Sequence, residues 1–279
     1  MSTRIPLWAS LIALCALTSC STGSNAPAPG TPGFYWSAAK IAYHAGDFRG
    51  ASQNLTELIR KDNEFTVRAM PITMAVTAGL AKGYSDLADC YEAGAKANRP
   101  NPTPFRKQVT SSRSMASAAA MEFAESVHLF LQKNKDPEIV FACESPTGAM
   151  AEPASLRKVA GGILIQDSER DTLEAALLQR GVLQTMSQMV GAPDDAAKTA
   201  EMFKAGEPKI ARATFVFATA KALYDLSPLF GSNKLDQPGR LEALCNEADE
   251  ALKSTPETKD TKALAVKVQA ALKKLKKNI

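Results

Sequence analysis

The chain has 279 residues, of which 45% are hydrophobic, 22% charged and 6% aromatic, and its formal net charge is +4. These values are ordinary for a globular protein and exclude a disordered chain, a collagen-like chain and a polytopic membrane protein. A net charge this small gives no indication of nucleic acid as a partner. The sequence is rich in alanine and poor in aromatic residues, which favours an all-α fold.

The N-terminus has the pattern of a targeting segment rather than of a folded element. Arg4 precedes a mostly apolar run over residues 5–16, which is too short to span a bilayer as a permanent helix. The tetrapeptide Leu17-Thr18-Ser19-Cys20 follows directly. It resembles the bacterial lipobox, in which a large aliphatic residue and two small residues precede a cysteine.

The resemblance implies that residues 1–19 are a lipoprotein signal peptide and that Cys20 is the lipidation site. In that family the cysteine thiol is diacylated, the chain is cut just before it, and the new amine is usually acylated too. Ser21 follows the cysteine, which by resemblance to enterobacterial lipoproteins favours the periplasmic face of the outer membrane. The alternative is an ordinary secretory signal with a chance cysteine.

Residues 20–33 would then be the lipidated cysteine and a flexible tether. The stretch 21–33 reads STGSNAPAPGTPG and has no large apolar residue. Such a composition cannot bury enough surface to order itself. We expect residues 34–279 to form one all-helical domain held at a distance from the bilayer. This domain would contain Cys90, Cys143 and Cys245, whose disulfide pairing the sequence leaves open.

Helical periodicity dominates the rest of the chain, which we expect to form an array or an irregular bundle of about nine helices. A kink or interruption is expected near Pro71, and a split near Gly161-Gly162. Alternation typical of strands is absent apart from brief apolar runs such as Ile139-Val140-Phe141. The expected helical segments are 34–45, 48–61, 66–98, 105–134, 138–144, 154–191, 193–205, 209–230, 239–254 and 257–277.

Segment 34–65 resembles a tetratricopeptide repeat, which implies a hairpin of two antiparallel helices. The matching residues are Trp36, Ala39, Ala42, Tyr43, the turn Gly46-Asp47-Phe48, Ala51 and Leu55. The segment departs from the pattern at Asp62-Asn63, where a proline-containing stop is usual. No clear second copy follows at the 34-residue period, and arrays of such repeats need about three units for stability.

The sequence contains few residues that could form a catalytic or metal-binding site. Glu125-x-x-His128, preceded by Glu122, has the spacing of half a di-iron carboxylate site, but His44 lies in no second such motif. A hydrogen-bonded polar stripe is the favoured interpretation. Since the sequence contains no nucleophile elbow, zinc-protease motif or phosphate-binding glycine loop, we expect no catalytic residue, no metal site and no cofactor.

The last helix is amphipathic. Its apolar stripe comprises Leu264, Val268, Ala271, Leu272 and Leu275, and residues 259–279 contain seven lysines and one aspartate. We favour a helix that caps the body with its apolar face and leaves its lysines in water. Docking on anionic lipid or on an acidic partner is the alternative.

These features suggest a lipid-anchored cell-envelope protein that is not an enzyme. A helical binding or scaffold protein for a protein partner is the leading hypothesis, because repeat-like hairpins leave one face free. The alternative is a small-molecule-binding accessory lipoprotein of a solute transporter. The sequence identifies no ligand-binding residues for either function.

The lipobox yields a direct prediction. Mass spectrometry of the native protein should find Cys20 as an acylated first residue, and fractionation should place the protein with the membranes. Retention of Met1, or an unmodified thiol at Cys20 together with recovery in the cytosolic fraction, would refute the anchor.

Overall fold

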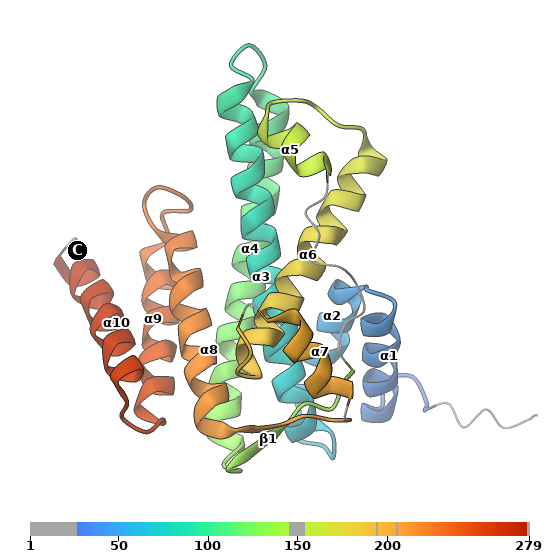
Figure 1. Ribbon diagram of the computed structural model, residues 1–279, viewed down its shortest axis with the longest axis vertical. Helices are drawn as coiled ribbons and strands as arrows, with labels where there is room; N and C mark the ends of the chain where they lie inside the picture. The colour runs from blue at the N-terminus through green and yellow to red at the C-terminus, as the bar shows by residue number, and fades with distance from the viewer. Residues whose placement is uncertain (1–26, 145–153, 194, 205, 278–279) are drawn as a thin grey trace, which may run out of the picture.

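The computed structural model describes residues 27–144, 154–193, 195–204 and 206–277 of the chain (Figure 1). In these residues it contains ten α-helices, one 3-10 turn and two three-residue strands. The expected all-α fold is therefore confirmed, with one helix more than the nine expected. The predicted signal peptide and Cys20 lie outside the described residues.

The ten helices of the described residues are divided evenly between the two halves of the chain. In the first half they are α1 (Pro32–His44), α2 (Phe48–Ile59), α3 (Thr66–Ala97), α4 (Thr103–Lys133) and α5 (Ala154–Ala160). In the second half they are α6 (Asp167–Met189), α7 (Ala196–Lys204), α8 (Arg212–Leu226), α9 (Pro238–Lys253) and α10 (Lys259–Lys277). Most predicted boundaries agree with these to within a few residues, including the split at Gly161-Gly162 between α5 and α6.

The central element is the hairpin of α3 and α4. These two long helices run side by side through the molecule, and α3 also contacts α2, α5, α6 and α8 (Figure 1). α3 runs through Pro71 without interruption, so the predicted break is absent. Pro71 lies in the second turn and leaves only the carbonyl of Val67 without its helical donor. Val67 is 43% exposed, so that carbonyl can be hydrated.

Three glycines allow α6 to cross α3 at very short range. A Cβ added to Gly79 would lie 2.4 Å from Cα of Val182, and one added to Gly181 would lie 2.2 Å from the carbonyl oxygen of Gly79. At Gly83 the added atom would lie 2.8 Å from Cα of Leu178. No larger residue fits these positions without separating the helices, so the crossing depends on glycine.

α1 and α2 form the predicted hairpin. Gly46 has a φ of +76°, which favours glycine, and the side chain of Asp47 accepts a hydrogen bond from the Gly50 amide at 2.9 Å. The aromatic ring of Tyr43 packs edge-on against Phe48 with a centroid separation of 5.6 Å. The ring of Trp36 stacks at 5.7 Å on Phe65, the residue that precedes α3.

One predicted helix is wrong. Residues 138–144 do not form a helix, because Glu138–Val140 is strand β1, paired antiparallel with β2 (Lys209–Ala211). Ile139 lies opposite Ile210, and both side chains are buried. Isoleucine suits an extended backbone, and each of the two segments supplies the hydrogen-bonding partner that the other needs as a strand. The predicted helix over 209–230 therefore begins only after β2, and its last residues, Ser227–Phe230, form the 3-10 turn η1.

α8, α9 and α10 follow one another away from the α3–α4 hairpin (Figure 1). The ring of Phe215 on α8 packs at 5.2 Å against Phe130 of α4 and at 5.6 Å against Phe141 after β1. α10, the outermost helix, contacts α9 and only weakly α8. No helix in the described part of the chain is both long enough and apolar enough to cross a membrane.

The close crossing of α3 and α6 predicts unequal effects of glycine substitutions. Gly79→Ala or Gly181→Ala should lower the free energy of unfolding by about 2 kcal/mol or more, because the added methyl group overlaps backbone atoms. Gly239→Ala is the matched control, since an added Cβ meets nothing within 4 Å in α9. It should be neutral or slightly stabilising. Urea unfolding followed by circular dichroism measures all three, and equal stabilities would contradict the packing described.

Candidate functional site

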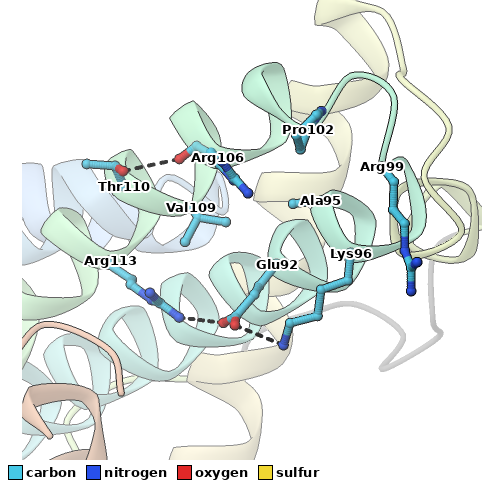
Figure 2. Close-up of a pocket in the computed structure, with 9 residues that line it drawn as sticks. All are labelled: Glu92, Ala95, Lys96, Arg99, Pro102, Arg106, Val109, Thr110 and Arg113. Atoms are coloured by element: carbon cyan, nitrogen blue, oxygen red, sulfur yellow. Dashed lines mark hydrogen bonds and ion pairs between the residues drawn. The ribbon is translucent and has the colours of Figure 1, made fainter. Parts of the chain in front are cut away.

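A hollow lies where α3 ends and α4 begins. It is a groove of about 620 Å3, which we call the basic groove. The α3 side contributes Glu92, Ala95, Lys96 and Arg99, and the α4 side contributes Pro102, Arg106, Val109, Thr110 and Arg113 (Figure 2). Since Lys96, Arg99, Arg106 and Thr110 are all exposed, the groove is open to solvent.

Glu92 is the one acidic residue of the groove, and two cations already hold it. Nζ of Lys96 lies 2.9 Å from one of its carboxylate oxygens, and a guanidinium nitrogen of Arg113 lies 2.5 Å from the other (Figure 2). The hydrogen bond from Lys96 lowers the pKa of Glu92 below its ordinary value, so this carboxylate is ionised at neutral pH. Arg113 is 13% exposed, and its Nε is a buried donor without a hydrogen-bond partner.

Two arginines of the groove are not paired within the described part of the chain. In the described residues the guanidinium groups of Arg99 and Arg106 make no hydrogen bond or ion pair, although the backbone carbonyl of Arg106 accepts from the Thr110 hydroxyl at 3.1 Å. The groove is therefore lined by four cationic side chains and one carboxylate, and two of the four cations contact that carboxylate. The guanidinium fork suits planar oxyanions, so this arrangement favours a ligand with several negative charges.

Four further hollows are smaller than the basic groove, and their linings differ from it in charge. The two more enclosed ones, beside Trp36 and Tyr43 and beside Phe105 and Ile163, have volumes of only about 20 and 50 Å3. Each is far below the volume of ordinary small-molecule pockets. An open hollow of about 340 Å3 at the opposite end of the hairpin has an acidic lining, comprising Glu64, Val67, Arg68, Pro71, Asn134, Asp136, Glu138 and Val140.

The predicted polar stripe on α4 faces α9. His128 lies beside Glu247, with Nδ1 3.2 Å from the carboxylate, and its Nε2 lies 2.7 Å from the amide nitrogen of Gln132. Glu122, Glu125 and His128 line a shallow hollow of about 420 Å3 with Glu247. Burial raises the pKa of Glu247, and the nearby His128 opposes that rise. Across the described residues no cluster of three or more His, Cys, Asp or Glu side chains could hold a metal ion.

His44 and the cysteines are dispersed. His44 is exposed at the end of α1, 4.0 Å from the carboxylate of Glu144. Cys90 is buried on α3, while Cys143 after β1 and Cys245 on α9 are free thiols. Burial raises the pKa of Cys143 to about 12, so its thiol stays protonated at neutral pH and is a poor nucleophile.

The packing of the C-terminal helix agrees with the interpretation that this helix caps the body with its apolar face. The apolar side chains of Leu264, Val268 and Leu272 are buried, and Ala271 and Leu275 are half-buried. The lysines at 267, 273, 274 and 276 are exposed. The apolar stripe is therefore used within the body rather than free for a bilayer.

The basic groove was missed in the sequence, although a signal for it exists. Residues 93–121 contain five cations, Lys96, Arg99, Arg106, Lys107 and Arg113, and no acidic residue. The run is diluted by alanine and serine, and a proline-rich loop divides it. Only the antiparallel pairing of α3 and α4 brings Arg113 opposite Glu92.

Comparison with known proteins found no match. The chain matches no protein-family model, and it matches none of the curated proteins or solved structures that were compared with it. Only its own residues and geometry therefore bear on its function.

The raised pKa of Cys143 predicts slow alkylation. At about pH 8 the folded protein should react with iodoacetamide at Cys143 on the order of a thousandfold more slowly than the protein unfolded in denaturant, because the thiolate fraction is that much lower. Mass-spectrometric mapping of the labelled peptides measures both rates. Equal rates in the two states would contradict the environment described for this thiol.

Proposed function

We propose that this protein is a lipid-anchored cell-envelope binding protein whose helical body holds an acidic segment of a protein partner in the basic groove. The lipobox at Leu17–Cys20 supports the anchor, and the groove supports the binding role. The proposed role is binding rather than catalysis, because the groove contains cations and one ion-paired carboxylate but no nucleophile with an adjacent base.

The unpartnered guanidinium groups of Arg99 and Arg106 are the observation that carries this proposal. Each stands on a short loop or first helical turn at the rim of an open groove, where an incoming carboxylate reaches it without breaking an existing ion pair. Ala95, Pro102 and Val109 give the groove apolar surface between the charges. Such a pattern of apolar floor and polar rim is typical of protein interfaces.

The small-molecule alternative has weaker support. A solute receptor would use a concave pocket that buries most of its ligand. The two more enclosed hollows described above hold only about 20 and 50 Å3. An extended acidic peptide, in contrast, fits an open groove.

Photo-crosslinking in living cells tests the proposal. A photoreactive amino acid in place of Thr110, an exposed residue that lines the groove, should give one discrete protein adduct. Arg99→Glu combined with Arg106→Glu should lower the adduct yield by about tenfold or more, because like charges then face the acidic segment. Circular dichroism should show that both variants remain folded.

Two controls make the result specific. The same photoreactive residue at exposed Ala270 of α10 should give no such adduct, and charge reversal at Lys273 and Lys274 should leave the Thr110 adduct unchanged. An adduct that survives charge reversal in the groove, or the absence of any protein adduct, would refute the proposed binding role. A small mass added at Thr110 would instead favour the solute-binding alternative.

A further inference from the structure

A small hollow between α3, the start of α4 and the α5–α6 connection contains a buried hydroxyl group that makes no hydrogen bond. Tyr91 of α3 is 4% exposed, and its hydroxyl oxygen is a buried atom without a hydrogen-bond partner in the described residues. Tyr91 lines this hollow, whose volume is about 50 Å3 and which we call the tyrosine hollow. Buried hydroxyl groups in proteins are as a rule hydrogen-bonded. This donor is therefore available to an acceptor that enters the hollow.

The walls of the tyrosine hollow are apolar. Phe105 of α4 and Val159 of α5 are buried, and Ile165 is half-buried. Two neighbouring aliphatic side chains, Ile163 and Leu164, also line the hollow but are 57% and 52% exposed. They form the part of the lining that reaches solvent. The hollow thus offers aliphatic contact together with one hydroxyl donor.

Arg170 of α6 contributes a cation to the same lining. Its side chain is 34% exposed, and one of its guanidinium nitrogens pairs with Asp167 at 2.5 Å. The side chain of Asp167 is 89% exposed, and an ion pair so open to water contributes little to stability. Because a guanidinium group has five N–H donors, Arg170 can bind a second oxyanion without losing this contact.

The hydroxyl of Tyr91 is a donor at neutral pH. Burial raises the pKa of Tyr91 to about 12, and the nearby charge of Arg170 opposes that rise. The hydroxyl therefore keeps its proton and can donate it in a hydrogen bond to an oxyanion. A hydroxyl donor and a guanidinium cation on one lining suit a carboxylate better than an amine or a purely apolar group.

Close packing fixes the walls of the hollow in place. A Cβ added to Gly94 of α3 would lie 2.3 Å from the carbonyl oxygen of Val159 and 2.7 Å from a ring carbon of Phe105. The Asn98 side-chain amide donates to the carbonyl of Gly162 at 3.0 Å, directly before the two exposed residues. α5 and the connection that follows it are thereby held against α3, near the α3–α4 turn (Figure 1). Since the hollow is preformed, a ligand does not have to order its walls.

We propose that the tyrosine hollow binds a short aliphatic carboxylate, whose carboxylate group contacts the Tyr91 hydroxyl and the Arg170 guanidinium. Its carbon chain lies against the aliphatic side chains of residues 163–165. The volume supports a short chain, because one water needs about 10–15 Å3 of cavity volume and about 50 Å3 therefore accommodates roughly four non-hydrogen atoms. A carboxylate group and its first carbon fill that space, and further carbons extend between the two exposed residues.

This site is separate from the basic groove. The two share no lining residue. The groove is open and contains four cations, so it selects for charge, whereas the hollow selects for a single carboxylate on an aliphatic chain. Binding in one does not require binding in the other.

Butyrate titrated into the full-length protein tests the site. Saturation-transfer NMR should show transfer to the butyrate protons with a millimolar Kd. The affinity should rise from acetate to butyrate as aliphatic contact is added. Butyramide and butylamine keep the carbon chain without the carboxylate, and they should bind about tenfold more weakly or worse. Equal affinities of acetate and butyrate would contradict the proposal, because a site that reads only charge would bind both alike.

Tyr91→Phe distinguishes ligand binding from packing. It removes only the hydroxyl, so the free energy of unfolding should stay unchanged or rise, because a buried donor without a partner is lost. Butyrate affinity should nevertheless fall by about tenfold. Tyr84→Phe is the matched control on the same helix, since it removes a hydroxyl that already donates to Glu174 at 3.3 Å. This variant should leave butyrate affinity unchanged, and Arg170→Gln should remove the preference for butyrate over butyramide.

Charge reversal in the basic groove provides a second control. Arg99→Glu with Arg106→Glu should leave butyrate affinity unchanged, although the same pair lowers the yield of the Thr110 adduct. The site in the hollow can therefore fail while the proposed partner site holds, and the reverse. Absence of saturation transfer to butyrate, or equal butyrate affinities of Tyr91→Phe and the unchanged protein, would overturn the proposal and leave the hydroxyl to water. Loss of butyrate binding in the groove variant would overturn it as well, by assigning butyrate to the groove.

Discussion

The close crossing of α3 and α6 is the contact on which the rest of the structure depends. Gly79, Gly83 and Gly181 contribute no side chain to it, so that the backbones of the two helices come into contact. Protein interiors are close-packed, so a methyl group added at this crossing would push α3 and α6 apart, together with the elements that pack on both helices. The crossing fixes α6 across one face of α3 and leaves the other face to α4. The positions of the other elements that contact α3 follow from this arrangement.

The two ends of the long α3–α4 hairpin differ in charge. The turn end carries the arginines of the basic groove. The opposite end carries the acidic hollow and the start of α1, to which the predicted tether leads. A body anchored at one end therefore presents its cations at the far end. Such a distribution suits a protein that reaches from a membrane toward an acidic surface or segment.

The titratable groups outside the groove act mainly in packing. His128 lies between Gln132 and Glu247 and helps to hold α9 against α4. Cys143 lies beside the buried ring of Tyr43, whose hydroxyl donates at 3.0 Å to the sulfur of Met186. The guanidinium groups of Arg99 and Arg106, in contrast, pair with no other side chain in the described residues.

The sequence by itself determined most of the helices, because these are specified locally by their apolar periodicity. The turn at Gly46-Asp47, the split at Gly161-Gly162 and the buried stripe of the last helix were all predicted correctly. Tertiary structure alone decided what depends on partners distant in the chain. Residues 138–140 are a strand only because 209–211 pair with them, and Gly79 is essential only because Gly181 meets it. Arg113 likewise faces Glu92 only across the folded hairpin. Local propensity cannot encode these contacts, since the pairing residues lie 21 to about 100 positions apart.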